Sequence, residues 1–344
     1  MITNLSEQEL ADLIREAGGK PFQARQLEHW IYKQGASDYA ACENLPNRLL
    51  EALAAHGPLL QSSVEDTVTA SDGTQKSLIR LADQETIETV LIPRGEHNTL
   101  CISTQVGCPV GCIFCASGLN GVRRNLQTGE IVEQVLHARR HSPSGRQLTN
   151  LVVMGIGEPL LNLANLLPAL DRIHDPDGIN MGARRITVST SGFPAQMDQL
   201  ATTPHSFNLA VSLHSADEEL RKRLVPATTA TVSEILDAAH RYFSATGRQI
   251  TFEVVLLSEV NDRARDAELL VRRLRTMPCT VNVLPWNPVE QIPDLDRPPP
   301  FRVDKFVTKL REGGLNVTVR KQRGADRSAA CGQLRILSQA PSAS

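Results

Sequence analysis

The sequence predicts an α/β protein whose main part is a parallel β-sheet covered by helices. From residue 99 onward, short β-branched and apolar segments alternate with segments of helical periodicity, and repeated βα units form parallel sheets. The chain has 344 residues, of which 41% are hydrophobic, so it is long enough for one large domain and a small one. It contains no run of 18 apolar residues, and we therefore expect no membrane-spanning helix.

Residues 1–62 are predicted to form a small helical domain. Ser6 and Glu9 have the spacing of a capping box, and apolar residues then recur at helical intervals. Further helices are expected over 22–32 and around 49–53.

Residues 63–98 are predicted to form a short antiparallel β extension. A turn signal at 71–74 separates two segments of alternating pattern, and 86–93 has the composition of a strand. Glu88 shares one face of that strand with Val90. A surface charge is the ordinary role of such a residue.

Residues 99–335 are predicted to form the parallel sheet and its helices, followed by a flexible tail over 336–344. A capping box at Thr231 and Glu234 begins one of the helices. Six or so βα units are fewer than the eight of a closed TIM barrel, and a site is expected at the carboxyl ends of the strands. The expected strands are Thr99–Gln105, Leu148–Met154, Arg185–Ser189, Asn208–Ser212, Thr251–Leu257, Thr280–Leu284 and Asn316–Val319.

Three cysteines follow the first of these strands. Cys108, Cys112 and Cys115 have the spacing C-x-x-x-C-x-x-C, which lets three thiolates from one loop converge on one inorganic cluster. A four-iron cluster normally takes four cysteines, so this loop leaves one iron open to a substrate or cofactor. A structural zinc site is the alternative, but it needs a fourth Cys or His, and the next His is His137.

Composition and charge limit the class of protein further. Seven cysteines, with three in a tight cluster, favour metal or redox chemistry over a disulfide framework, and the N-terminus lacks the features of a signal peptide, so a cytoplasmic protein is expected. The net charge of −2 indicates that a nucleic-acid partner would have to meet local basic groups. Each candidate group is also common on a solvated surface. The candidates are Arg123–Arg124, Arg139–Arg140, Arg184–Arg185 and Arg320–Arg323.

Polar residues follow several of the predicted strands. In the segment 155–159, Gly155 and Gly157 allow a backbone to approach a ligand closely, and Glu158 can pair with an ammonium group. Other strand ends carry hydroxyl, imidazole and amide groups that can bind a ribose or a carboxylate, although each is individually more common as a turn or cap. These residues are Ser189, Ser212, His214 and Asn287.

Cys331 lies in a Gly- and Ala-rich loop near the C-terminus and could be incidental. Basic neighbours nevertheless favour its thiolate and so its nucleophilicity. Cys42 and Cys279 are expected to be structural.

The sequence around these motifs resembles the RlmN/Cfr family of radical S-adenosylmethionine (SAM) RNA methyltransferases. The resemblance spans roughly residues 5–335 and is carried by 99–108, 114–115, 154–162 and 329–334. It implies a partial (β/α)6 TIM-like barrel, a [4Fe-4S] cluster on the cysteine triplet and two SAM molecules per turnover. The residues that it implies for SAM binding are Gly157, Glu158, Pro159, Ser189, Ser212, Leu213, His214 and Asn287.

The implied reaction is methylation of carbon 2 of an adenosine. This carbon is not nucleophilic, so a radical route supplied by a cofactor is required. By resemblance, Cys331 carries the methyl group, and a 5′-deoxyadenosyl radical removes hydrogen from it before the carbon radical adds to adenine. Glu88 is the implied proton acceptor, and Cys101 is implied to attack Cys331 and release the product through a transient disulfide.

The implied partners are 23S rRNA, tRNA at its anticodon loop, and a flavodoxin- or ferredoxin-type electron donor, with no membrane association. The segment 20–32 resembles the family's helical RNA-binding domain, although its residues are equally compatible with simple packing. Two alternatives stay open: a Cfr-like enzyme that methylates carbon 8, and a cluster-bearing RNA-binding or redox-sensing protein without turnover. The chain ends soon after Cys331, and 226–229 departs from the family's usual P-I/V-N. Both departures are expected to affect the range of RNAs more than the radical chemistry.

Overall fold

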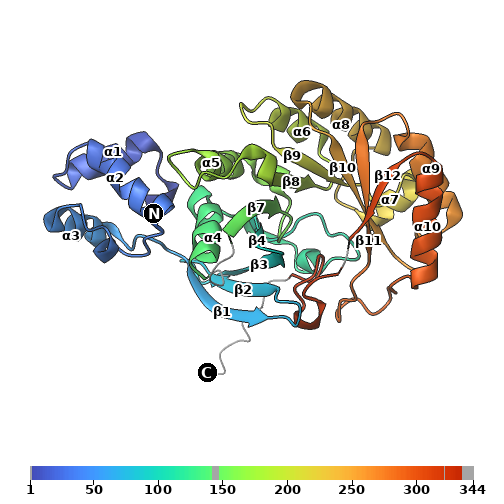
Figure 1. Cartoon of the computed structure of the whole chain (residues 1–344), viewed down its shortest axis with the longest axis horizontal. Helices are drawn as coiled ribbons and strands as arrows, with labels where there is room; N and C mark the ends of the chain where they lie inside the picture. The colour runs from blue at the N-terminus through green and yellow to red at the C-terminus, as the bar shows by residue number, and fades with distance from the viewer. Residues whose placement is uncertain (1, 142–146, 321, 335–344) are drawn as a thin grey trace.

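The computed structural model describes residues 2–141, 147–320 and 322–334 (Figure 1). Helices α1–α3 lie at one side of a large sheet, whose strands curve around a common interior with helices α4, α5, α6, α8, α9 and α10 outside (Figure 1). Ten described strands form this sheet in the order β1-β2-β3-β4-β7-β8-β9-β10-β11-β12. The predicted α/β fold is therefore confirmed. The predicted tail, 336–344, lies outside the described residues.

The N-terminal helices begin as their capping residues predict. Ser6 accepts a hydrogen bond from the backbone N–H of Glu9, whose side chain bonds back to the Ser6 backbone. The helix predicted over 22–32 changes from α to π geometry and ends at Gly35, which has φ 72°. The elements are η1 (Ile2–Asn4), α1 (Glu7–Glu16), α2 (Phe22–Glu28), the π-helical turn η2 (His29–Gln34), η3 (Tyr39–Ala41) and α3 (Asn47–His56).

Two arginines of α4 (Thr128–His141) attach the N-terminal helices to the barrel. Arg139 donates to the backbone carbonyl of Tyr32 at 2.7 Å, and Arg140 donates to that of Gly35 at 3.1 Å. This pair was one of the candidates for a nucleic-acid contact; both side chains are exposed, and their guanidinium groups also cap the carbonyl end of η2. Long-range packing has given them a structural role.

The β extension is continuous with the barrel. Strands β1 (Ser63–Thr69), β2 (Gln75–Arg80) and β3 (Thr86–Arg94) are antiparallel, as predicted, and the first turn contains Gly73 with φ 82°. β3 then pairs with β4 (His97–Cys101), so one sheet runs through both parts.

From β4 to β12 every neighbouring pair in the sheet is parallel. Six βα units are followed by β12, which agrees with a partial (β/α)6 barrel. A short extra helix, α7 (Glu218–Leu224), follows β9. The strands are β7 (Gln147–Val153), β8 (Ile186–Thr190), β9 (Asn208–Ser212), β10 (Ile250–Leu256), β11 (Cys279–Pro285) and β12 (Asn316–Val319). The remaining helices are α5 (Leu163–His174), α6 (Pro194–Ala201), α8 (Val232–Thr246), α9 (Ala264–Leu274) and α10 (Pro300–Glu312).

The strand predicted over 99–105 is wrong in its second half. β4 ends at Cys101, and Gln105–Gly107 forms β5, which pairs with β6 (Val122–Asn125) in a separate two-stranded sheet. The chain changes sheets because the intervening backbone is bound by other loops: Gly155 donates to Ile102 O at 2.9 Å, and Leu126 donates to Thr104 O at 2.9 Å. The cysteine loop therefore projects from the carboxyl end of the barrel.

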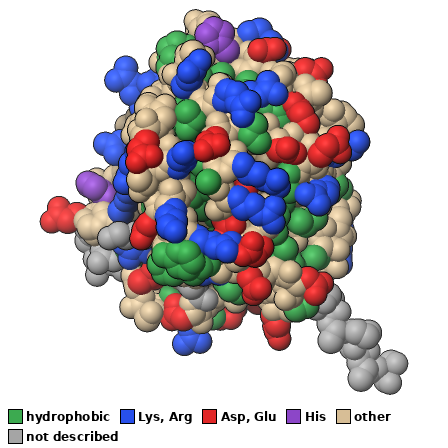
Figure 2. Space-filling model, turned by 90° about the vertical axis from the view of Figure 1, so that its right-hand side faces the viewer, with side chains coloured by type: hydrophobic (Ala, Val, Ile, Leu, Met, Phe, Trp, Pro, Cys, Tyr) green, Lys and Arg blue, Asp and Glu red, His purple; other side chains and the backbone are tan. Residues whose placement is uncertain are grey.

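The surface carries a mixture of charges. On the face seen in Figure 2, Lys and Arg side chains are interleaved with Asp and Glu, which agrees with the net charge of −2. In the described part of the chain, no helix is long and apolar enough to cross a membrane.

Candidate active site

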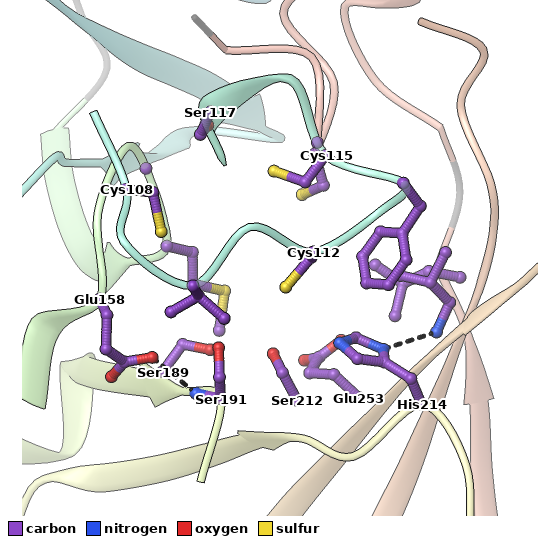
Figure 3. Close-up of a pocket in the computed structure, with 18 of the residues that line it drawn as sticks. Cys108, Cys112, Cys115, Ser117, Glu158, Ser189, Ser191, Ser212, His214 and Glu253 are labelled. Carbon is purple, nitrogen blue, oxygen red and sulfur yellow. Dashed lines mark hydrogen bonds between the residues drawn. The ribbon is translucent and has the colours of Figure 1, made fainter. Parts of the chain in front are cut away.

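A cavity of about 160 Å³ opens at the carboxyl ends of the barrel strands. The three sulfurs of the cysteine triplet point into it from one loop, and polar side chains from the strand ends lie across from them (Figure 3). Eleven of the predicted site residues line this cavity: Cys108, Cys112, Cys115, Gly157, Glu158, Pro159, Ser189, Ser212, His214, Asn287 and Cys331.

The cysteine loop is held by backbone hydrogen bonds on both sides. Cys108 N–H donates to Gly121 O at 3.0 Å, and Ile113 N–H donates to Leu224 O at 3.2 Å. Burial raises the pKa of Cys108 to about 12, and that of Cys112 well above its ordinary value. A bound iron cluster would offset this desolvation, because its positive charge favours thiolates. Three free thiols in one cavity are thus suited to hold three irons of a cluster.

The glycines after β7 allow two segments to pack closely. A Cβ at Gly155 would lie 2.7 Å from Ile102 O, and a Cβ at Gly157, which has φ 110°, would lie 2.8 Å from Gln105 Cβ. Both glycines are thus required by contact with the segment before the cysteine loop. This contact is a further reason for them besides the ligand approach that the sequence predicted.

Glu158 is a buried carboxylate at the cavity wall. It accepts hydrogen bonds from the N–H groups of Leu160 at 3.1 Å and Ser191 at 2.7 Å. Burial raises the pKa of Glu158 although these N–H groups oppose the shift. A carboxylate that is oriented in this way and faces a cavity is suited to bind an ammonium group.

His214 is a neutral imidazole at the opposite wall. Its Nδ1 accepts from Val255 N–H at 3.2 Å, and burial lowers the pKa of His214 to about 3. The ring packs edge-on against Phe114, with centroids 4.7 Å apart. The preceding Leu213 is fully buried and does not line the cavity, so of the predicted segment only Ser212 and His214 can contact a ligand there by their side chains.

The loop that carries Cys331 is bound to the cysteine loop. Ala116 N–H donates to Gly332 O at 2.8 Å, and Ser117 Oγ donates to Leu334 O at 2.7 Å. Asn287 donates to the Cys331 carbonyl at 3.1 Å, so one predicted SAM ligand also positions this loop.

Cys331 lines two cavities. The second cavity, of about 730 Å³, occupies the barrel interior and extends to β3 and β12. The first cavity contains the cysteine triplet, and Cys331 lies at the boundary between them.

Cys101 and Glu88 line neither of the two cavities. Cys101 is buried among Val90 and Ala329, and burial raises the pKa of its thiol to about 12. Glu88 is 2% exposed, and its carboxylate lies 2.7 Å from Lys76 Nζ. Val90 pairs in register with Cys101, so Glu88 is one step along the same strand face.

Sequence reasoning missed Glu253 and misassigned Arg320. Both side chains line both cavities. Glu253 is buried on β10 and accepts from Asn282 Nδ2 at 3.0 Å, and burial raises its pKa. The electrostatic interaction with the nearby Cys331 side chain is the main cause of the raised pKa of Arg320. A lone charged residue within an apolar strand was the available signal for Glu253, whereas Arg320 was grouped with candidate surface charges.

The segment 226–229, which departs from the family's usual P-I/V-N, contacts an arginine that supports the wall of the first cavity. Thr228 accepts from Arg221 Nη1 at 2.8 Å, and the same guanidinium donates to the carbonyl of Ser191. Arg221 is 2% exposed, and burial lowers its pKa to about 10. Thr228 thus supports the cavity wall through Arg221, and the expected effect of this segment on the range of RNAs stays a prediction.

Three cysteines from one loop facing a polar rim at the end of a (β/α)6 barrel define a radical SAM enzyme. Residues 102–270 match the Radical SAM superfamily, and residues 2–57 match the "Ribosomal RNA large subunit methyltransferase N-terminal domain".

The chain belongs to the RlmN family of RNA methyltransferases. It is 42% identical over 97% of its length to the probable dual-specificity RNA methyltransferase RlmN of Rhodopirellula baltica, of which it covers 90%. It is also 42% identical over 98% of its length to the corresponding protein of Symbiobacterium thermophilum, of which it covers 92%. The crystal structure of a radical SAM methyltransferase from Sphaerobacter thermophilus has a TM-score of 0.93 at 44% identity, covering 96% of this chain and 98% of that one. The cofactors are accordingly a [4Fe-4S] cluster and SAM.

Proposed function

We propose that this chain methylates carbon 2 of an adenosine in 23S rRNA and in tRNA by way of a methyl group carried on Cys331. The position of Cys331 at the boundary of two cavities carries this proposal. When bound, the cluster and SAM supply a methyl group and a 5′-deoxyadenosyl radical. A carbon on this sulfur is open to the cofactor cavity on one side and to a large cavity on the other.

Around the first cavity, each group has a role that fits its chemistry. Cys108, Cys112 and Cys115 hold the cluster. Glu158 binds the ammonium group of SAM, because it is an oriented buried carboxylate. The neutral His214 and the hydroxyl groups at the strand ends bind polar groups of the same cofactor.

The two remaining catalytic residues are Cys101 and Glu88. Cys101, as a thiolate, attacks the sulfur of Cys331, so that a Cys101–Cys331 disulfide forms while the carbon–sulfur bond to the product breaks. The electron pair of that bond goes to the carbon, which takes up a proton and leaves as the methyl group of the product. Both cysteines are free thiols in the structure. Cys101 packs against Val90 and Ala329, and Cys331 contributes to its raised pKa, so the two thiols lie near each other. Glu88 accepts the proton that leaves the adenine, and Lys76 holds its carboxylate in place.

The second cavity is the proposed site of the target base. A base must leave its stack to reach a buried reactive atom, and the volume of about 730 Å³ is ample for a purine. Residues 1–62 act as an accessory RNA-binding domain, on which Phe22 is 57% exposed and can stack on an unpaired base. We place the enzyme in the cytoplasm with its RNA substrates and with a flavodoxin- or ferredoxin-type electron donor.

Mass spectrometry of RNA from cells with and without this protein tests the proposal. The expected result is loss of 2-methyladenosine from 23S rRNA and tRNA, with no recovery by a Cys331→Ala variant. Loss of 8-methyladenosine alone would show that the carbon assignment is wrong. A fully clustered preparation that yields no 5′-deoxyadenosine from SAM after reduction would favour the non-catalytic alternative.

A further inference from the structure

Three segments meet at the outer side of the cysteine loop. Ile113 N–H donates to Leu224 O at 3.2 Å, and Ala227 N–H donates to Val110 O at 3.3 Å, so the loop lies against the chain that follows α7. On its other side, a Cβ at Gly118 would lie 2.9 Å from the Cα of Gly111. The cysteine loop therefore packs against both the segment after α7 and the segment around Gly118.

This surface has an apolar centre. Ile113, in the cysteine loop itself, is 41% exposed, and Leu119 is 48% exposed. Pro226 is exposed and reaches to 3.9 Å from a Cβ position at Gly111. Large apolar groups exposed together on a monomer commonly mark a contact with another protein. We call Ile113, Leu119, Pro226, Lys222 and Arg223 the outer face of the cysteine loop.

The rim of the outer face is basic. Lys222 and Arg223 are exposed in the last turn of α7, next to Leu224. On the same helix, Glu218 is directed to the N–H of Val232 at 2.8 Å. By contrast, Arg123 of the neighbouring β6 is paired with Glu85 at 2.6 Å. Glu219, one turn earlier on α7, is also exposed, so Lys222 and Arg223 together leave this end of the face with a net positive charge that suits an acidic partner.

We propose that the outer face of the cysteine loop docks a small acidic electron-transfer protein. The inference rests on the proposed function, because a radical enzyme needs one electron for each cleavage of SAM. One electron leaves the donor, which is oxidised by one electron, and enters the cluster, which is reduced by one electron; no atom is transferred. Ile113 directly follows the cluster ligand Cys112, so a donor at this face would have a short path to the cluster.

Charge and polarity favour a protein over RNA as the occupant. An apolar centre with a basic rim is complementary to an acidic protein, whose association such a rim accelerates. RNA instead presents phosphates and sugars, which favour a broadly polar and basic surface.

The test compares two reductants on the clustered enzyme. We would reduce Lys222→Glu/Arg223→Glu protein with dithionite or with reduced flavodoxin or ferredoxin, and follow the loss of cluster absorbance in a stopped-flow instrument. The expected result is a second-order rate with the protein donors that falls by about tenfold or more at low salt. The rate with dithionite should not change. Donor affinity, measured by calorimetry on the clustered enzyme, should fall in parallel.

The matched control is Arg272→Glu/Arg275→Glu. These exposed arginines lie at the end of α9, just before β11 begins, and therefore at the amino-terminal end of the strands. This control should leave both reductions unchanged. A second variant, Leu119→Asp, changes the apolar centre, which lies on a different segment. If the α7 variant loses its cluster, this second variant is used in its place, and its reduction by the protein donors should slow in the same way.

An unchanged rate of reduction by both protein donors in Lys222→Glu/Arg223→Glu and in Leu119→Asp would overturn the proposal. So would a loss of RNA binding without a loss of donor affinity, because the face would then belong to RNA. If donor-dependent reduction responds as expected while no methylated RNA forms, the docking face stands and the proposed function fails.

Discussion

Replacing Glu158 by Gln tests the assignment of the ammonium site. The carboxylate accepts N–H groups from Leu160 at 3.1 Å and from Ser191 at 2.7 Å. An amide supplies one oxygen and one NH₂ group, so one of these N–H groups would face another donor. A buried donor left unsatisfied costs about 1–3 kcal/mol, and relief of the desolvation that raises the pKa of Glu158 offsets part of this loss.

The effect on SAM binding should be larger than the effect on folding. Loss of a charge-assisted hydrogen bond to the ammonium group costs about 1.5–3 kcal/mol, or roughly a 10- to 150-fold increase in Kd. Equilibrium dialysis of SAM against the clustered enzyme measures this change, and urea denaturation measures stability.

Glu133→Gln is the matched control for this substitution. Glu133 is also a fully buried carboxylate, and it accepts from Ser62 N–H at 2.8 Å and from Thr3 Oγ1 at 2.8 Å, but it lines neither cavity. The Glu133→Gln variant should have a lower free energy of unfolding but an unchanged Kd for SAM. An unchanged Kd in Glu158→Gln, or an equal increase in both variants, would refute the assigned role.

Three further predictions concern other parts of the chain. Cys101→Ala should stop the reaction with RNA bound covalently to the enzyme, seen as a slower band on a denaturing gel; release of product at the wild-type rate would contradict the disulfide step. Burial lowers the pKa of His137 to about 4, below its ordinary value near 6.5, so this group contributes stability above pH 6.5 that is lost as the pH falls toward 4. A His137→Gln variant should show a smaller decrease in unfolding free energy over that window, and an identical pH profile would argue against this linkage. Arg221→Met should weaken SAM binding severalfold by removing support from the Ser191 carbonyl, whereas Thr228→Asn should not, because the amide keeps an acceptor for Arg221; equal losses in calorimetry would contradict this.

Local interactions explain why much of the fold could be predicted. The capping boxes at Ser6 and Thr231 join atoms only three residues apart, so no distant contact is needed to form them. The strand Asn208–Ser212 was predicted with the bounds that the structure has. The spacing of the cysteine triplet likewise predicted that three thiolates converge from one loop, and all three cysteines line one cavity.

The break after Cys101 could not be predicted from pattern. Residues 99–107 are continuous in β character, but the backbone after Cys101 is bound by Gly155 and Leu126 from later in the chain. These partners become neighbours only when β7 and α4 have packed.

Charged residues separate the two kinds of information most clearly. By itself, the sequence determined the parallel α/β architecture, the helix starts, the cysteine triplet and the polar strand ends, because each depends on residues close together in the chain. Only the tertiary structure decided that Arg140 holds the N-terminal helices, that Arg320 lies between two cavities, and that Glu253 faces them. A charged side chain is stable at the surface or in a satisfied interior site, and the partners that make the interior site come from distant segments.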